Sequence, residues 1–245
     1  MKLLIDAGNT RVKWQLLCGG AVLTEGVATL DMEDVFQEWA ARSESINRIA
    51  VSTVIAEDRR RQLQARLEAI CGAEVVFHWA ERRRGRLVNA YADVHRMGAD
   101  RWHAMCGGWQ VTGAGGFAVV DAGSAITVDY VARSGAHLGG YILPGKQMML
   151  RSLRQDAARI GFDSLDAEQG APGTSTTECV QHGLAWLREA MVERIHRDCG
   201  SLGLNKVLVT GGDASGLIGA GLSAVHDPYL VLNGLAAVDG DWEAE

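Results

Sequence analysis

Two short stretches of this sequence have the residue types of a phosphate-binding turn. Residues 6–10 read DAGNT and residues 121–124 read DAGS, and each stretch follows one apolar run and precedes another. This pattern predicts a tight turn between two antiparallel strands. Glycine lets the backbone approach an anion closely because it has no Cβ, so the N–H groups and the hydroxyl of such a turn can converge on phosphate oxygens.

The aspartate of each stretch would repel a polyphosphate unless a metal ion lies between them. A divalent cation reverses the sign of that interaction, so we expect Asp6 to face a metal-bound phosphate. Lys13 lies on the second strand of the same predicted hairpin and can reach a phosphate as a point charge. In the second stretch Ser124 offers the same hydroxyl at the equivalent place.

One such stretch alone is equally compatible with an ordinary hairpin, because Asp, Asn and Gly are common turn residues. The two aspartates lie 121 − 6 = 115 residues apart, close to half of the 245-residue chain. This repetition favours a duplicated structure with two phosphate loops that face each other across a cleft. A third segment, KVLVTGGDA at residues 206–214, predicts a strand that ends at two glycines, where a nucleoside could lie against bare backbone.

Both halves of the chain begin with three apolar runs and continue with helices that alternate with strands. Helical patterns are expected at residues 31–43 with Asp31 as N-cap, from about 98–100, and at 57–72, 146–160, 176–200 and 233–239. The order predicts an α/β fold with mixed sheets, built from two domains of the same fold at residues 1–112 and 113–245.

Composition excludes several classes of protein. A formal net charge of −6 makes nucleic acid an improbable main partner, and no window approaches the apolar length of a membrane span. The five cysteines are scattered with no Cys-x-x-Cys pair, which disfavours a disulfide framework or a zinc site. We expect a cytoplasmic protein with reduced thiols.

Two basic runs, at residues 59–61 and 82–86, depart from the acidic average. Because this chain uses Arg heavily, a solvated helix face or loop is the more economical interpretation of each run. Contact with an anionic ligand or partner is the alternative. The sequence alone leaves both open.

Five motifs, in order along the whole chain, resemble the type III pantothenate kinases. They are DAGNTRVKW near the N-terminus, GADRW at residues 98–102, DAGSAITVD at 121–129, GGYILPG at 139–145 and TGGDA at 210–214. The resemblance implies two duplicated ribonuclease-H-like domains of the actin-like ATPase and sugar-kinase superfamily, with the active site in the interdomain cleft. It also implies ATP-dependent phosphorylation of the primary hydroxyl of pantothenate, the first step toward coenzyme A.

The resemblance assigns the acceptor side to the GADR motif and a nearby tyrosine. Asp100 would be the base that deprotonates the acceptor hydroxyl, and Arg101 would contact substrate or the transferring phosphoryl group. Tyr91, Gly98 and Ala99 would line the pantothenate site. Without the resemblance, the preferred interpretation of Asp100 is an acidic residue favoured at a helix N-terminus.

The resemblance assigns ATP to the two predicted turns. ATP phosphates with Mg²⁺ would bind at the first turn, through Asp6, Gly8, Asn9, Thr10 and Lys13. In the second turn Asp121 would hold a monovalent cation, K⁺ or NH4⁺, and Ser124 would touch ATP.

A later Asn-Thr pair of the family corresponds here to Ser175 and Thr176, so Thr176 carries over as a substrate contact. The missing Asn leaves the start of the following helix open. Members of the family are homodimers, and we expect the same here. Two alternatives remain from the sequence: a transcriptional accessory factor whose kinase site is idle, and a kinase of another small hydroxyl compound.

Overall fold

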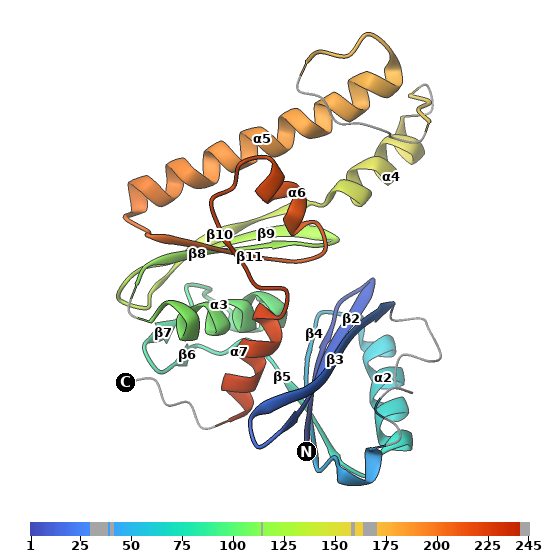
Figure 1. Cartoon of the computed structure of the whole chain (residues 1–245), viewed down its shortest axis with the longest axis vertical. Helices are drawn as coiled ribbons and strands as arrows, with labels where there is room; N and C mark the ends of the chain where they lie inside the picture. Colours follow the sequence, from blue (N-terminus) through green and yellow to red (C-terminus); the bar gives the residue numbers. More distant parts are fainter. Residues whose placement is uncertain (30–38, 40–41, 114, 158–159, 164–170, 241–245) are drawn as a thin grey trace. The chain divides into compact units, whose positions relative to one another are not determined.

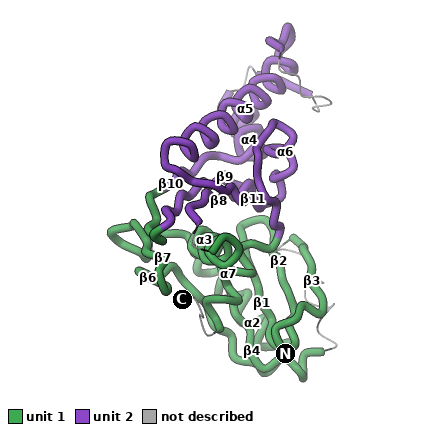
Figure 2. The backbone as a smooth tube through the Cα atoms, turned by 60° about the vertical axis from the view of Figure 1, so that its left-hand side comes forward, with its two compact units in different colours: residues 1–114, 134–139, 229–245 green, residues 115–133, 140–228 purple. Residues whose placement is uncertain are grey.

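The computed structural model describes residues 1–29, 39, 42–113, 115–157, 160–163 and 171–240 (Figure 1). The chain forms two compact units, coloured separately in Figure 2. Unit 1 comprises Met1–Ala114, Ser134–Gly139 and Tyr229–Glu245, and unit 2 comprises Gly115–Arg133 and Gly140–Pro228. The last segment of the chain is thus counted with the first unit, and the duplicated halves at 1–112 and 113–245 stay a prediction.

Unit 1 contains a five-stranded mixed sheet in the order β3-β2-β1-β4-β5. Its strands are β1 (Lys2–Ala7), β2 (Arg11–Cys18), β3 (Ala21–Thr29), β4 (Arg48–Thr53) and β5 (Glu74–His78). The first three strands pair antiparallel, whereas β4 and β5 join in parallel. The remaining elements are α2 (Glu57–Ile70), α3 (Ala99–Thr112), α7 (Leu230–Asp239), the short hairpin β6 (Arg83–Arg84) and β7 (Leu87–Val88), and single 3₁₀ turns at Ser43–Ser45 and Val94–Arg96.

Unit 2 repeats this plan with the strand order β10-β9-β8-β11-β12. Its strands are β8 (Phe117–Ala122), β9 (Ala125–Val131), β10 (His137–Pro144), β11 (Lys206–Thr210) and β12 (Val225–His226). Its helices are α4 (Lys146–Asp156), α5 (Thr176–Leu202) and α6 (Ala214–Gly219). The predicted α/β class with mixed sheets is therefore confirmed, and the two sheets share one strand order.

Most helices expected from the sequence are present, with shifted ends. The helix expected at 57–72 ends at Ile70, and its C-cap is Cys71 in an extended conformation, so Gly72 is not a left-handed cap. The helix expected at 146–160 ends at Asp156. The prediction of a helix at 31–43 with Asp31 as N-cap lies almost wholly outside the described residues. In the part of the chain that the structure describes, no helix is both long and apolar enough to cross a membrane.

Strand β1 is buried on both faces, which explains its unbroken apolar sequence. Leu3 and Ile5 point into a cluster that includes Leu63 of α2, whereas Leu4 points into a cluster with Leu235 of α7. Each residue is fully buried or nearly so. Helices on both faces thus fix the strand that ends at the first predicted phosphate turn.

Helices α3 and α7 pack against each other through glycines. A Cβ on Gly107 would lie 2.3 Å from the carbonyl oxygen of Leu230, and one on Gly234 would meet the carbonyl oxygen of His103. The backbones can approach this closely only without side chains at those two positions. Burial lowers the pKa of His103 to about 3, so the ring is neutral and its Nδ1 lies 2.7 Å from Ser52 Oγ on β4.

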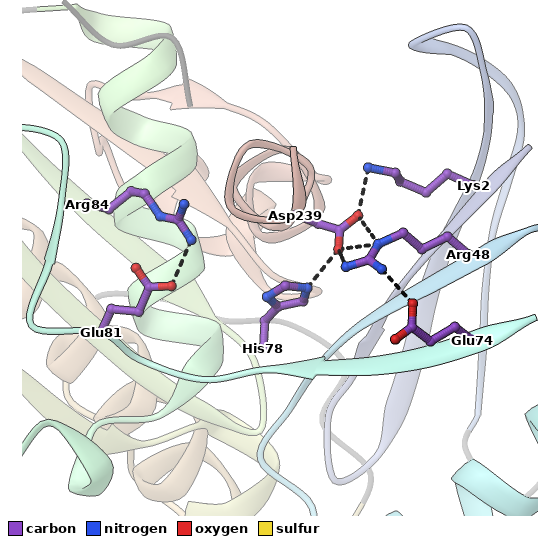
Figure 3. A network of polar contacts seen from close by, with 7 residues as sticks. All are labelled: Lys2, Arg48, Glu74, His78, Glu81, Arg84 and Asp239. Carbon is purple, nitrogen blue, oxygen red and sulfur yellow. Dashed lines mark hydrogen bonds and ion pairs between the residues drawn. The ribbon is translucent and has the colours of Figure 1, made fainter. Parts of the chain in front are cut away.

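The last residue of α7 contacts two cationic side chains and one histidine of the sheet (Figure 3). The carboxylate of Asp239 is fully buried and lies 2.6 Å from Lys2 Nζ, 2.7 Å from Arg48 Nη2 and 2.9 Å from His78 Nε2. Burial alone would raise the pKa of Asp239, but hydrogen bonds from these three partners outweigh burial and hold the pKa well below its usual range. This network fixes α7, and α7 in turn supports α3.

We predict that Asp239→Asn lowers the free energy of unfolding by about 3 kcal/mol, because it leaves partly buried cations without their anion. Glu74→Ala removes the exposed partner of Arg48 and should cost less than about 1 kcal/mol. Because the pKa of Asp239 is depressed in the folded protein, its contribution is present above about pH 4 and is lost as the pH falls through the folded pKa. Urea unfolding of both variants at several pH values measures this; equal losses for the two would contradict it.

Candidate functional site

The first predicted turn connects β1 and β2, as expected. The backbone N–H of Gly8 donates to the carbonyl oxygen of Arg11 at 2.9 Å and closes the turn, which leaves Asn9 and Thr10 exposed at its tip. The strand register pairs Asp6 directly with Lys13. The hairpin therefore brings a carboxylate and an ammonium side chain together at the base of the turn.

Two residues outside the predicted turn support it. Thr53 Oγ1 at the end of β4 donates to the carbonyl oxygen of Ala7 at 2.9 Å and also accepts from the N–H of Ile55. Arg59 Nη1, at the start of α2, lies 3.3 Å from the carbonyl oxygen of Asn9. One member of the first basic run thus contacts the turn itself. Thr53 can support the turn because β4 pairs in parallel with β1, which places Thr53 beside Ala7.

The second predicted turn connects β8 and β9, and Gly123 closes it by donating to the carbonyl oxygen of Ala125 at 3.0 Å. Asp121 pairs in register with Thr210 of β11, next to the TGGDA segment. Gly211 has φ +95°, and a Cβ there would lie 2.5 Å from Asp121 Oδ1 and 2.4 Å from the carbonyl oxygen of Ala122. Glycine is therefore required at 211 both by the backbone conformation and by the neighbouring carboxylate.

The GGYILPG motif ends against the same turn. The N–H of Gly145 donates to the carbonyl oxygen of Ser124 at 3.1 Å, and a Cβ on Gly145 would lie 2.4 Å from the carbonyl oxygen of Gly123. Gly145 is also the N-cap of α4. Three motifs that are distant in sequence thus meet at one end of the unit 2 sheet.

A cavity of about 230 Å³ lies next to these segments in unit 2. Its polar lining includes Lys146, Arg188, Asp213 and Ser215, and its apolar lining includes methionine and leucine side chains of α4, α5 and α6. This combination of an apolar body and a few polar groups is typical of small-molecule sites.

The GADR motif forms the start of α3. Gly98 is the N-cap, Ala99 is the first residue of the helix, and Asp100 Oδ1 accepts a hydrogen bond from the N–H of Arg101 at 2.7 Å. A Cβ on Gly98 would lie only 2.5 Å from Asp100 Oδ1. The glycine therefore leaves the space in which the carboxylate lies over the first turn of the helix, where the helix dipole favours negative charge.

Arg101 and Tyr91 are in direct contact. Arg101 is only 5% exposed, and its Nη1 donates a hydrogen bond to Tyr91 Oη at 2.8 Å. The guanidinium carbon lies 5.6 Å from the centre of the Tyr91 ring. The structure thus brings Tyr91, Arg101 and Asp100 together at the N-terminus of α3, although Tyr91 lies on an irregular loop.

Thr176 is the first residue of α5. The N-cap is Ser175, whose Oγ accepts a hydrogen bond from the N–H of Glu178 at 3.2 Å, so serine caps this helix where the family has asparagine. Hydrogen bonds from the N–H and hydroxyl of Thr174 lower the pKa of Glu178. A second, open cavity of about 700 Å³ is lined by residues 173–176 together with side chains of α4 and α5.

Comparison with known proteins decides the family. The family model for type III pantothenate kinases matches residues 2–198. The chain belongs to the type III pantothenate kinase family. A type III pantothenate kinase of Marinobacter nauticus is 53% identical over 238 residues, which cover 97% of this chain and 98% of that one.

Solved structures share the fold. A Campylobacter jejuni protein named for the Baf family of transcriptional activators superposes with a TM-score of 0.58 at 21% identity, over 96% of each chain. The activator of 2-hydroxyisocaproyl-CoA dehydratase from Clostridium difficile, with bound ADPNP, gives 0.54 at 12% identity, over 97% of this chain and 93% of that one. The chain thus shares its fold with both of these proteins. At such low identity neither likeness says anything about activity.

As a member of this family, the protein is a kinase that phosphorylates pantothenate with ATP, at the first step of coenzyme A biosynthesis. The roles of Tyr91, the GADR motif and the two turns in this reaction remain predictions. The meeting of the two turns across a cleft also stays a prediction.

We predict that Gly98→Ala lowers kcat about tenfold or more, because the new Cβ displaces the Asp100 carboxylate. The thermal stability of Gly98→Ala should change little, because the Asp100 carboxylate can rotate away from the new Cβ. Gly72→Ala is the matched control, because nothing lies within 4 Å of its added Cβ and its φ is negative. Steady-state kinetics and thermal melting of both variants measure this; wild-type kcat in Gly98→Ala would contradict the explanation for the glycine.

Proposed function

We propose that Asp100 is the base of the kinase reaction. Its carboxylate accepts the proton of the primary hydroxyl of pantothenate as the hydroxyl oxygen attacks the γ-phosphorus of ATP, and ADP leaves. Support comes from one observation above all: Asp100 lies at the N-terminus of α3, hydrogen-bonded by the Arg101 N–H and beside the space left by Gly98. Phosphoryl transfer asks mainly for position and charge, so a single well-placed carboxylate suffices at the acceptor.

Arg101 and Tyr91 complete the acceptor side of the proposal. The buried guanidinium supplies a fixed positive charge that would offset charge developing on the transferred phosphoryl group. Tyr91 orients this guanidinium through its hydroxyl and presents its ring to pantothenate. Gly98 and Ala99 would line the same site with backbone alone, and Thr176 would contact the substrate from the start of α5.

ATP binding is proposed at the two turns. Gly8, Asn9 and Thr10 would hold the phosphates through backbone N–H groups and the Thr10 hydroxyl, with Lys13 as a point charge. The carboxylate oxygens of Asp6 fit Mg²⁺, which prefers hard oxygen ligands together with water and phosphate. Mg²⁺ would supply neutralisation of phosphate charge. The nucleoside would occupy the 230 Å³ cavity beside Lys146 and Asp213.

A monovalent cation is proposed at the second turn, held by Asp121 while Ser124 touches ATP. The Asp121 carboxylate and the carbonyl oxygen of Ala122 both lie close to Gly211. Such oxygen atoms are suitable ligands for K⁺ or NH4⁺. The chain would act in the cytoplasm, where ATP and reduced thiols are both present.

A homodimer is proposed through apolar side chains that are exposed on unit 2. Apolar side chains of β10 and α5 are exposed there, including Ile142 at 64% and Trp186 at 65%. Exposed apolar groups of this size on one unit are typical of interaction surfaces.

We predict that Asp100→Asn lowers kcat at least a hundredfold while the Kd for ATP changes less than about twofold, because the amide cannot accept the proton and the phosphates bind elsewhere. Coupled detection of ADP gives kcat, and titration calorimetry gives the Kd. Retention of wild-type kcat would remove Asp100 from the role of base.

We predict that the wild-type enzyme needs K⁺ or NH4⁺ and that Asp121→Asn loses this dependence. Activity is measured with Mg²⁺-ATP in K⁺, NH4⁺ and Na⁺ buffers of equal ionic strength. Asp156→Asn, an exposed aspartate at the end of α4 in the same unit, is the control and should keep the preference. A wild-type enzyme that is equally active in all three buffers would contradict the proposed cation.

A further inference from the structure

We propose that Arg82 is a positioning residue of the acceptor side, which holds the loop of Tyr91 so that the tyrosine stays on Arg101. The inference rests on the proposed roles of Tyr91 and Arg101. It also gives a role to one residue of the second basic run, at 82–86.

The Arg82 guanidinium binds three carbonyl oxygens of the loop that carries Tyr91. Its Nη1 donates to the carbonyl oxygens of Asn89 at 3.3 Å and Tyr91 at 2.5 Å, and its Nη2 donates to that of Ala92 at 2.6 Å. In return, the carbonyl oxygen of Arg82 accepts from the N–H of Asn89 at 3.0 Å. A planar guanidinium with five N–H donors can bridge several carbonyls at once, which a lysine ammonium cannot match in geometry.

Asn89 provides a second attachment of the same loop. This residue is 2% exposed, its Oδ1 accepts from the N–H of Tyr91 at 2.9 Å, and its Nδ2 donates to the carbonyl oxygen of Glu81 at 3.2 Å. The N–H of Tyr91 is thus held by Asn89 and its carbonyl by Arg82. Both polar backbone groups of the residue are fixed by side chains, so no regular helix or strand is needed to hold it.

The side chain of Tyr91 makes contacts at its ring and at its hydroxyl. Its ring stacks on His137, with ring centres 6.4 Å apart and an angle of 17° between the planes, and its hydroxyl accepts from Arg101. A shift of the loop would move the ring off the histidine and take an acceptor from a buried guanidinium. Misplacement by about 1 Å is enough to reduce catalysis strongly.

The neighbouring arginines do not share this arrangement. Arg84 Nη2 pairs with Glu81 Oε1 at 2.7 Å, on the hairpin itself. Arg83 is exposed, and within the described residues its side chain has no hydrogen bond or ion pair. Arg83→Ala is therefore a matched control, since it removes the same charge from the same hairpin without touching the loop.

The test compares Arg82→Ala, Arg82→Lys, Arg83→Ala and Tyr91→Phe in the full-length enzyme. We expect Arg82→Ala to raise the KM for pantothenate about tenfold, with the KM for ATP within twofold of wild type. Arg82→Lys should recover only part of the loss, and Arg83→Ala should match the wild type. Adding Arg82→Ala to Tyr91→Phe should raise the pantothenate KM less than twofold further, because both changes act through one contact.

Hydrogen exchange gives a readout that is independent of activity. Backbone amides of residues 88–93 should exchange faster in Arg82→Ala than in Arg83→Ala, whereas α2 should exchange equally in both. Unchanged exchange, an unchanged pantothenate KM or an equal rise in the ATP KM would each overturn the proposal. If Tyr91→Phe itself leaves the pantothenate KM unchanged, the proposed role of the Tyr91 hydroxyl on Arg101 fails instead, so the two failures are distinguishable.

Discussion

The two carboxylates proposed to act in the site, Asp100 and Asp121, each lie where a nearby glycine leaves out a Cβ. A Cβ on Gly98 would lie 2.5 Å from Asp100 Oδ1, and a Cβ on Gly211 would lie 2.5 Å from Asp121 Oδ1. Both distances are too short for atoms that are not bonded to each other. A Cβ at either glycine would displace the carboxylate, so the glycine is what allows the carboxylate to lie where it does. The motifs GADR and TGGDA owe their glycines to this constraint rather than to turn propensity alone.

The elements around these positions serve to hold them. The ion pairs of Asp239 attach α7 to β1 and β4, the glycine contacts of α7 hold α3, and α3 presents Asp100 and Arg101 at its N-terminus. In unit 2, the turn after β8 is held by Gly145 on one side and by the parallel pairing of β8 with β11 on the other. Residues with no chemistry of their own thus determine the geometry of those that react.

Much of this could be read from the sequence, because the signals are local. The alternation of apolar runs with turn residues predicts the three strands with which each half of the chain begins. The short turn between the first two strands then places Asp6 opposite Lys13. The position of the GADR motif at the start of a helix is likewise a local property. Other features are not local: the support of Ala7 by Thr53, the burial of Asp239 and the grip of Arg82 on the loop of Tyr91 depend on parallel pairing or on irregular backbone. From the sequence alone, a run of arginines is interpreted as a solvated surface, because the carbonyl groups that it binds are not known.

The account depends most on Asp100 as the base. A crystal structure with pantothenate and a non-hydrolysable ATP analogue tests this directly, by the distance between the Asp100 carboxylate and the primary hydroxyl of pantothenate. The account predicts a distance of about 3 Å, with the hydroxyl directed at the analogue's terminal phosphorus. A hydroxyl that is hydrogen-bonded to another side chain, with Asp100 out of reach even through one water, would contradict it.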